Sequence, residues 1–107
     1  MRFKDQVAIV TGGARAGGIG AAIAKRFMEE GAKVVIGDIL EEEGKETAKN
    51  LSNTGGEVEF IKTDMTVLDQ IERMIDFAVS KFGRLDILVN NAGIMVRSHA
   101  IDLSESD

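Results

Sequence analysis

The sequence has no cysteine, tryptophan, tyrosine or proline, and it has one histidine. Without cysteine there is no disulfide, no thiolate metal ligand and no cysteine nucleophile. Without tyrosine, no phenol can act as a general acid or base. The single histidine and the scattered carboxylates do not form the cluster that a metal site needs. These absences exclude several classes of enzyme whose chemistry would have to come from this chain alone.

Positive charge is also scarce, because 13 Lys and Arg face 18 Asp and Glu and leave a formal net charge of −5. An acidic chain without a basic stripe argues against nucleic acid and anionic membranes as partners. No apolar run approaches the ~20 residues of a membrane span, and residues 1–5 lack a signal-peptide pattern. We expect one cytoplasmic domain over residues 1–107, since the lack of cysteine is compatible with the cytosol.

Apolar runs and helical patterns alternate along the chain. Short apolar runs predict strands, and apolar residues at helical spacing predict helices, most clearly in the third helix. The expected strands are 6–11, 33–38, 57–62 and 85–90, and the expected helices are 19–30, 41–51 and 67–82. This alternation predicts an α/β fold, a Rossmann-type doubly wound parallel sheet truncated to about four strands in the order 3-2-1-4. In the first helix, Ile19, Ile23 and Phe27 are expected to form one apolar stripe.

The fourth expected strand, LDILVN, is apolar and would have an unpaired outer edge. Such an edge invites pairing with another chain. We therefore expect self-association into a homo-oligomer, through this strand or through the sheet face that helix 67–82 alone covers. Residues 102–107 resemble a helix start, so we expect 98–107 to begin a further helix or to form a frayed tail. A helix start without a body suggests a fragment.

A glycine-rich turn, TGGARAGGIG, joins the first expected strand to the first expected helix at residues 11–20. Glycine lets the backbone approach a phosphate closely and adopt positive φ. The helix after the turn directs free N–H groups and its dipole at an anion. The strict G-x-G-x-x-G string is absent, but the position of the glycines predicts a phosphate-binding turn. A merely flexible loop is the alternative.

Asp38 ends the second expected strand, 18 residues after Gly20. A carboxylate at this point of a doubly wound fold reaches the adenosine ribose 2′-OH of a dinucleotide. At ~4 Å and an effective dielectric near 20, each pair of like charges with a 2′-phosphate would cost roughly 4 kcal/mol. The predicted cofactor is therefore NAD rather than NADP. Asp38 could instead cap the next helix, and Arg15 could hold a 2′-phosphate or face solvent.

Three features, at residues 11–20, 64 and 90–93, resemble the short-chain dehydrogenase/reductase family in their order and spacing, and the resemblance covers residues 4–107. Thr-Gly at 11–12 and Gly-Ile-Gly at 18–20 resemble its glycine motif. Asn-Asn-Ala-Gly at 90–93 resembles the motif that comes after its fourth strand. Asp64 matches a position whose side chain contacts the adenine amino group in the family.

The resemblance implies a place for each matching residue along a bound dinucleotide. The glycine motif lines the pyrophosphate, the carboxylate after the second strand holds the ribose, residues 64–65 flank adenine, and residues 90–93 support the nicotinamide-side ribose. The candidate cofactor-binding residues are Gly12, Arg15, Gly18, Ile19, Gly20, Asp38, Ile39, Asp64, Met65, Asn90, Ala92 and Gly93. As alternatives, Asp64 or Thr66 could cap the third helix, and the Asn-Asn pair could only tie its loop to the sheet.

The chain departs from the family in two ways. The glycine turn has five residues, Gly13 to Gly17, where the family usually has three. This longer turn could still wrap a pyrophosphate, or it could bulge and weaken binding. The family's catalytic Tyr, the Lys four residues later and the Ser all lie beyond the fourth strand, and this chain has no Tyr.

The resemblance implies that the chain is the N-terminal NAD-binding portion of an oxidoreductase that interconverts an alcohol and a carbonyl by hydride transfer. The chain alone is expected to be inactive. The alternatives are a non-catalytic dinucleotide-binding module and a structural or self-associating domain.

Overall fold

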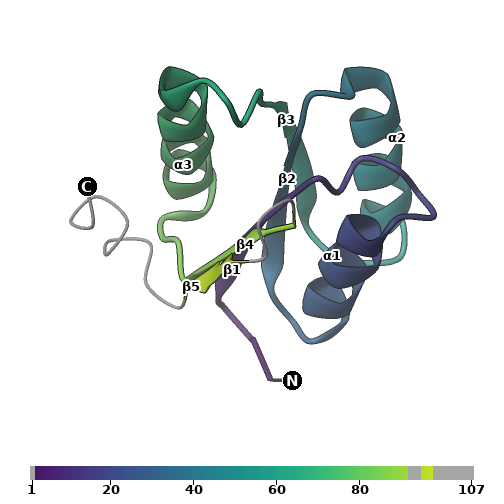
Figure 1. Cartoon of the computed structure of the whole chain (residues 1–107). Helices are drawn as coiled ribbons and strands as arrows, with labels where there is room; N and C mark the ends of the chain where they lie inside the picture. Colours follow the sequence, from purple (N-terminus) through teal and green to yellow (C-terminus); the bar gives the residue numbers. More distant parts are fainter. Residues whose placement is uncertain (1, 92–94, 98–107) are drawn as a thin grey trace.

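We describe residues 2–91 and 95–97 of a computed structural model of the chain. The helices are α1 (Ile19–Glu29), α2 (Glu41–Ser52) and α3 (Leu68–Phe82), and the strands are β1 (Val7–Thr11), β2 (Lys33–Asp38), β3 (Val58–Lys62), β4 (Ile87–Asn90) and β5 (Met95–Arg97) (Figure 1). The seven elements that the sequence predicts are present, and their ends agree within two residues. No described helix is long and apolar enough to cross a membrane.

The first four strands form a parallel sheet in the order β3-β2-β1-β4, as predicted. Thr11, the last residue of β1, is level with Gly37 on β2 and with Asn90 on β4. The carboxyl ends of the three central strands therefore meet at one edge of the sheet. The direction of winding reverses between β1 and β4, where ligands bind in doubly wound folds.

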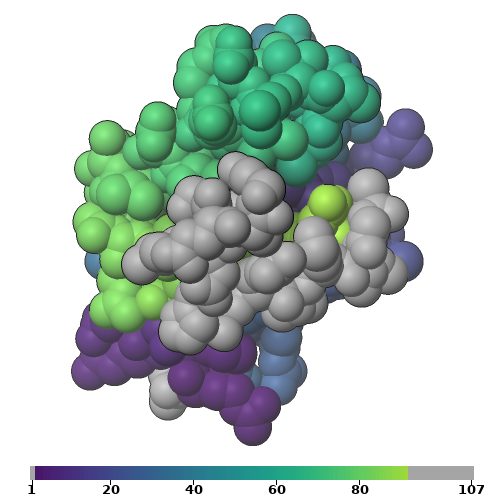
Figure 2. All heavy atoms as spheres, turned by 60° about the vertical axis from the view of Figure 1, so that its left-hand side comes forward, coloured from purple at the N-terminus to yellow at the C-terminus, as the bar shows by residue number. Residues whose placement is uncertain are grey.

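Helices cover both faces of the sheet: α1 and α2 lie on one side and α3 lies on the other (Figure 1). Ala8 and Val10 of β1 belong to the core under α1 and α2, while Val7 and Ile9 belong to the core under α3. Every residue of β1 is buried, which explains why its sequence is apolar without alternation. Figure 2 shows the side of the molecule that α3 covers, with α3 in teal to green and the N-terminal residues in purple at the opposite end.

The predicted unpaired edge of β4 is wrong, because β5 pairs with β4 in antiparallel orientation and makes the sheet five-stranded. In this pairing Leu88 is opposite Arg97 and Asn90 is opposite Met95. A buried strand needs partners for its outer backbone groups, and a short returning strand supplies them from the same chain. Because the outer edge of β4 is already paired, it gives no reason to expect self-association through this strand. A homo-oligomer formed in another way stays a prediction. Residues 98–107, with the predicted helix start, lie outside the described residues.

Candidate functional site

The glycine turn lies directly against the first turn of α1. A Cβ atom on Gly20 would overlap the carbonyl oxygen of Gly12, so the close contact requires glycine at that position. Gly12 has a φ of 72°, which is in the left-handed region that favours glycine. Gly18 is the N-cap residue of α1 and makes no side-chain cap bond. The first N–H groups of α1 are thus not capped by a side chain, as an anion-binding helix start requires.

Ala14 anchors the longer turn through both of its backbone polar groups. Its N–H donates to Asp38 Oδ2 (3.1 Å), and its carbonyl accepts a hydrogen bond from the Thr47 hydroxyl of α2 (2.5 Å). Ala14 and Thr47 are both buried. We call this arrangement the Ala14 clamp. It holds the turn to β2 and α2, which is not the behaviour of a merely flexible loop.

The carboxylate of Asp38 connects the glycine turn to the start of α2. While Oδ2 accepts the Ala14 N–H, Oδ1 accepts the N–H of Leu40 (3.2 Å), the residue immediately before α2. Asp38 is therefore not the N-cap residue of α2. A carboxylate offers about four lone-pair sites, so two donors leave capacity for a further hydroxyl donor.

Arg15 lies on the α2 side of the turn. It lines a cavity of about 330 Å³ there, together with Glu43 and Glu46 of α2. Arg15 is exposed, and the cavity that it lines also contains these two carboxylates. The exposure of Arg15 agrees with the alternative that its side chain faces solvent.

The ends of β1 and β4 are tied together by Thr11. Its buried hydroxyl accepts a hydrogen bond from the Asn91 N–H (3.1 Å) and lies 3.2 Å from the side-chain oxygen of Asn90. A Cβ atom on Gly12 would lie 3.1 Å from the side-chain nitrogen of Asn91. The Asn-Asn pair therefore ties its loop to the sheet directly beside the glycine turn. Ala92 and Gly93 lie outside the described residues.

Asp64 closes a turn between β3 and α3. Its Oδ1 accepts hydrogen bonds from the N–H (2.9 Å) and the hydroxyl (2.6 Å) of Thr66, and these bonds lower the pKa of Asp64. The N-cap residue of α3 is Val67, which makes no side-chain cap bond. The alternative that Asp64 or Thr66 caps this helix is thus wrong, because the helix begins after both. Met65 packs against the core under α3.

Two isoleucines of the candidate set are exposed at this edge of the sheet. Ile19, the first residue of α1, is 73% exposed, and Ile39, the residue after β2, is 54% exposed. The predicted apolar stripe of the first helix is correct for Ile23 and Phe27, which pack against the core, and wrong for Ile19. Helical spacing alone does not reveal that the first turn of α1 extends beyond the sheet. Both side chains are accessible to a ligand.

Sequence reasoning missed Thr47 and gave Thr11 no role of its own. Nothing near Thr47 distinguishes it from the other polar residues of α2, because its partner is 33 residues away in the chain. Thr11 lies inside the Thr-Gly motif, so its position was visible but its bonds to β4 were not. Both side chains act on the backbone around the candidate site.

A parallel sheet of reversed winding with a glycine turn, a carboxylate and an Asn pair at its carboxyl edge defines a Rossmann-type α/β protein. The sequence pattern of the family described as short chain dehydrogenase matches residues 6–107. The chain belongs to this family, whose members generally bind NAD(P).

Relatives and solved structures agree with this assignment. An uncharacterized oxidoreductase of Thermotoga maritima is 46% identical over the whole chain, which covers 41% of that protein. Zerumbone synthase of Zingiber zerumbet is 42% identical, and the chain covers 39% of it. The crystal structure of a hydroxysteroid dehydrogenase from Escherichia coli superposes with a TM-score of 0.81 at 38% identity, over 86% of this chain and 37% of that one. The chain spans about two fifths of the length of the curated relatives it matches.

Proposed function

We propose that the chain is the NAD-binding portion of an oxidoreductase that interconverts an alcohol and a carbonyl. The observation that carries this proposal is the convergence of the glycine turn and Asp38 at the carboxyl edge of the sheet, joined through Ala14. Family membership supports an oxidoreductase of the dehydrogenase type. The alcohol and carbonyl activity would belong to the whole protein, since the chain spans about two fifths of the length of the curated relatives it matches.

The residues at this edge fit a dinucleotide. The start of α1 would hold the pyrophosphate, because no side chain caps its N–H groups and the close contact of Gly20 with Gly12 holds the helix start against the glycine turn. Asp38 would accept hydrogen bonds from the adenosine ribose while keeping its two backbone donors. Ile39, Asp64 and Met65 would flank the adenine. On the nicotinamide side, Asn90 would support the ribose.

The same carboxylate favours NAD over NADP. A 2′-phosphate at the ribose would face the Asp38 charge, at a cost of roughly 4 kcal/mol per pair of like charges at ~4 Å. Arg15 would not offset this cost, since the cavity that it lines also contains the carboxylates of Glu43 and Glu46. Separately from the choice of cofactor, the cytoplasmic location of the protein stays a prediction.

Hydride transfer is the chemistry that the bound cofactor supplies. This chain contributes binding and orientation, and it has no tyrosine to provide the proton. That absence favours a second candidate function for the isolated chain, a dinucleotide-binding module without catalysis. The two candidates share the same site, and they differ in whether the whole protein adds a catalytic segment to it.

A titration of the chain with NADH and, separately, NADPH tests the shared site, with nicotinamide fluorescence and calorimetry as readouts. We expect saturable binding with NADH preferred. Asp38→Asn keeps the size of the side chain and removes its charge, so it should reduce the preference for NADH by about tenfold or more, equivalent to 1.4 kcal/mol. Asp76→Asn, an exposed carboxylate on α3, is the matched control. Binding of neither cofactor, or the same preference for NADH over NADPH in the Asp38→Asn variant as in the unmodified chain, would count against the proposal.

A further inference from the structure

The outer edge of β3 has backbone groups that do not face the sheet. The Glu57 carbonyl accepts a bond from Val34 N–H (2.9 Å), and the Thr63 N–H donates to the Asp38 carbonyl (2.8 Å), so residues 57 and 63 face β2. Peptide groups alternate in direction along a strand. The N–H and C=O groups of Val58, Phe60 and Lys62 therefore point away from β2. β3 is the edge of the sheet on this side.

The open part of this edge is short. Ser52, at the end of α2, blocks it at Val58, because its hydroxyl accepts the Val58 N–H (3.2 Å) and donates to the Val58 carbonyl (2.9 Å). Within the part of the chain that the structure describes, no such bond occupies the outward groups of Phe60 and Lys62. Phe60 and Lys62 are thus two successive outward-facing positions with which the backbone of an added strand could form hydrogen bonds.

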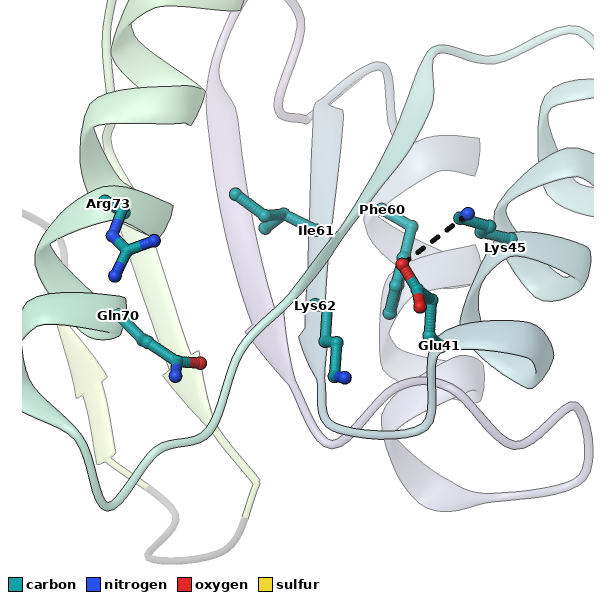
Figure 3. A pocket seen from close by; sticks show the side chains of 7 residues that line it. All are labelled: Glu41, Lys45, Phe60, Ile61, Lys62, Gln70 and Arg73. Atoms are coloured by element: carbon teal, nitrogen blue, oxygen red, sulfur yellow. Dashed lines mark ion pairs between the residues drawn. The ribbon is translucent and has the colours of Figure 1, made fainter.

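A groove of about 350 Å³ runs over these two positions. In Figure 3, Phe60 points toward α2, where Glu41 and Lys45 lie, while Ile61 points toward α3, where Gln70 and Arg73 lie. The groove thus crosses the edge of the strand from one face of the sheet to the other. An extended segment lying along β3 would place alternate side chains on these two faces.

The groove is positively charged in a chain that is negative overall. Its lining includes three cations, Lys45, Lys62 and Arg73, and one carboxylate, Glu41, whose oxygen lies 3.5 Å from the Lys45 nitrogen. The whole chain has a net charge of −5. An acidic occupant is therefore favoured at this edge, on either side of β3.

We propose that an extended acidic segment of a partner protein docks here and adds a strand to β3. Backbone bonds to Phe60 and Lys62 would supply the pairing, and the three cations would meet the carboxylates of the segment. A second copy of this chain fits less well, because a two-fold interface places the same patch on both subunits. It would bring two sets of these cations together.

The test is fluorescence anisotropy of the whole chain with a labelled peptide, Gly-Ser-Glu-Glu-Val-Glu-Glu-Gly-Ser, which places carboxylates on both faces of an added strand. We expect saturable binding that weakens with salt. The double variant Lys62→Glu/Arg73→Glu should weaken binding by about tenfold or more. Lys25→Glu, an exposed charge reversal on α1, should change it by less than about twofold.

The same peptide with alternate amides N-methylated separates strand addition from general attraction between charges. It keeps its carboxylates and loses its strand-pairing donors, so we expect it to bind about tenfold more weakly to the unmodified chain. Equal binding of both peptides, or unchanged binding to the double variant, would overturn the proposal. Dimerisation in sedimentation experiments that the double variant abolishes would also overturn it, in favour of a second copy. The methylated peptide tests the idea even where the double variant does not fold.

Discussion

At the scale of single residues, Ala14 shows how a lengthened turn keeps its shape. Its N–H and carbonyl are bound by side chains from two different elements, Asp38 at the end of β2 and Thr47 in α2. Both bonds are found at a buried residue, where an unpaired backbone group costs free energy. Two extra residues therefore do not leave the turn unsupported, and Asp38 is both the candidate ribose ligand and a support of the turn.

Thr47→Val tests the clamp. The substitution keeps the shape of the side chain but removes the donor to the buried Ala14 carbonyl, so the free energy of unfolding should fall by about 1–3 kcal/mol. Urea denaturation measures this loss. NADH binding should weaken as well, because the turn is no longer held to α2.

Thr47→Ser is the matched control, since it retains the hydroxyl. We expect it to recover most of the NADH affinity that Thr47→Val loses. If the valine variant binds NADH as tightly as the unmodified chain, Thr47 stabilises the fold without positioning the turn.

At the scale of elements, α2 contains a glycine that lowers its helix propensity but lets the helix pack closely against the sheet. Gly44 lowers the helix propensity of α2, yet a Cβ atom there would overlap the ring of Phe60 on β3. Glycine thus allows α2 to lie against the aromatic ring. The close contact brings Thr47, one turn further along, to the glycine turn.

Gly44→Ala should destabilise the chain by about 1–3 kcal/mol through overpacking, although alanine favours a helix. Thermal or urea unfolding measures the change. Gly17→Ala is a suitable control, because a Cβ atom at Gly17 would have no neighbour within 4 Å; its effect should stay within about 0.5 kcal/mol. An alanine at Gly44 that raised stability would mean that propensity outweighs the contact.

At the scale of the whole molecule, Asp86 connects the beginning of the chain to its last parallel strand. Its Oδ2 accepts the Val7 N–H (2.8 Å), and its own N–H donates to the Val7 carbonyl (2.9 Å), across 79 positions of sequence. Arg84 also contacts the carboxylate (2.6 Å), and this pairing raises the pKa of Arg84. The start of β1 is thereby set level with the start of β4.

Asp86→Ala should lower the free energy of unfolding by about 1.5–3 kcal/mol, because it removes hydrogen bonds to a charged group and leaves the Val7 N–H without that partner. Chemical denaturation gives the value. Asp69→Ala, at an exposed position of α3, serves as the control and should have a much smaller effect. Equal effects of the two variants would argue against the role of Asp86 in joining β1 to β4.

The sequence by itself determined the kinds of elements and their order in the sheet. Apolar periodicity and glycine placement are local, so they predict β1 to β4 and α1 to α3 from neighbouring residues alone. Short connections and right-handed crossovers then leave few arrangements of four parallel strands. The glycine turn, Asp38 and the Asn pair could be placed at one edge of the sheet for the same reason.

Only the tertiary structure decided how these elements meet. The pairing of β5 with β4, the exposure of Ile19, the contact of Gly44 with Phe60 and the bond from Thr47 to Ala14 were not predicted. The last two depend on how closely α2 approaches the sheet and the turn, which no local period encodes. A hydrogen bond between residues 33 positions apart exists only after packing has brought its two elements together.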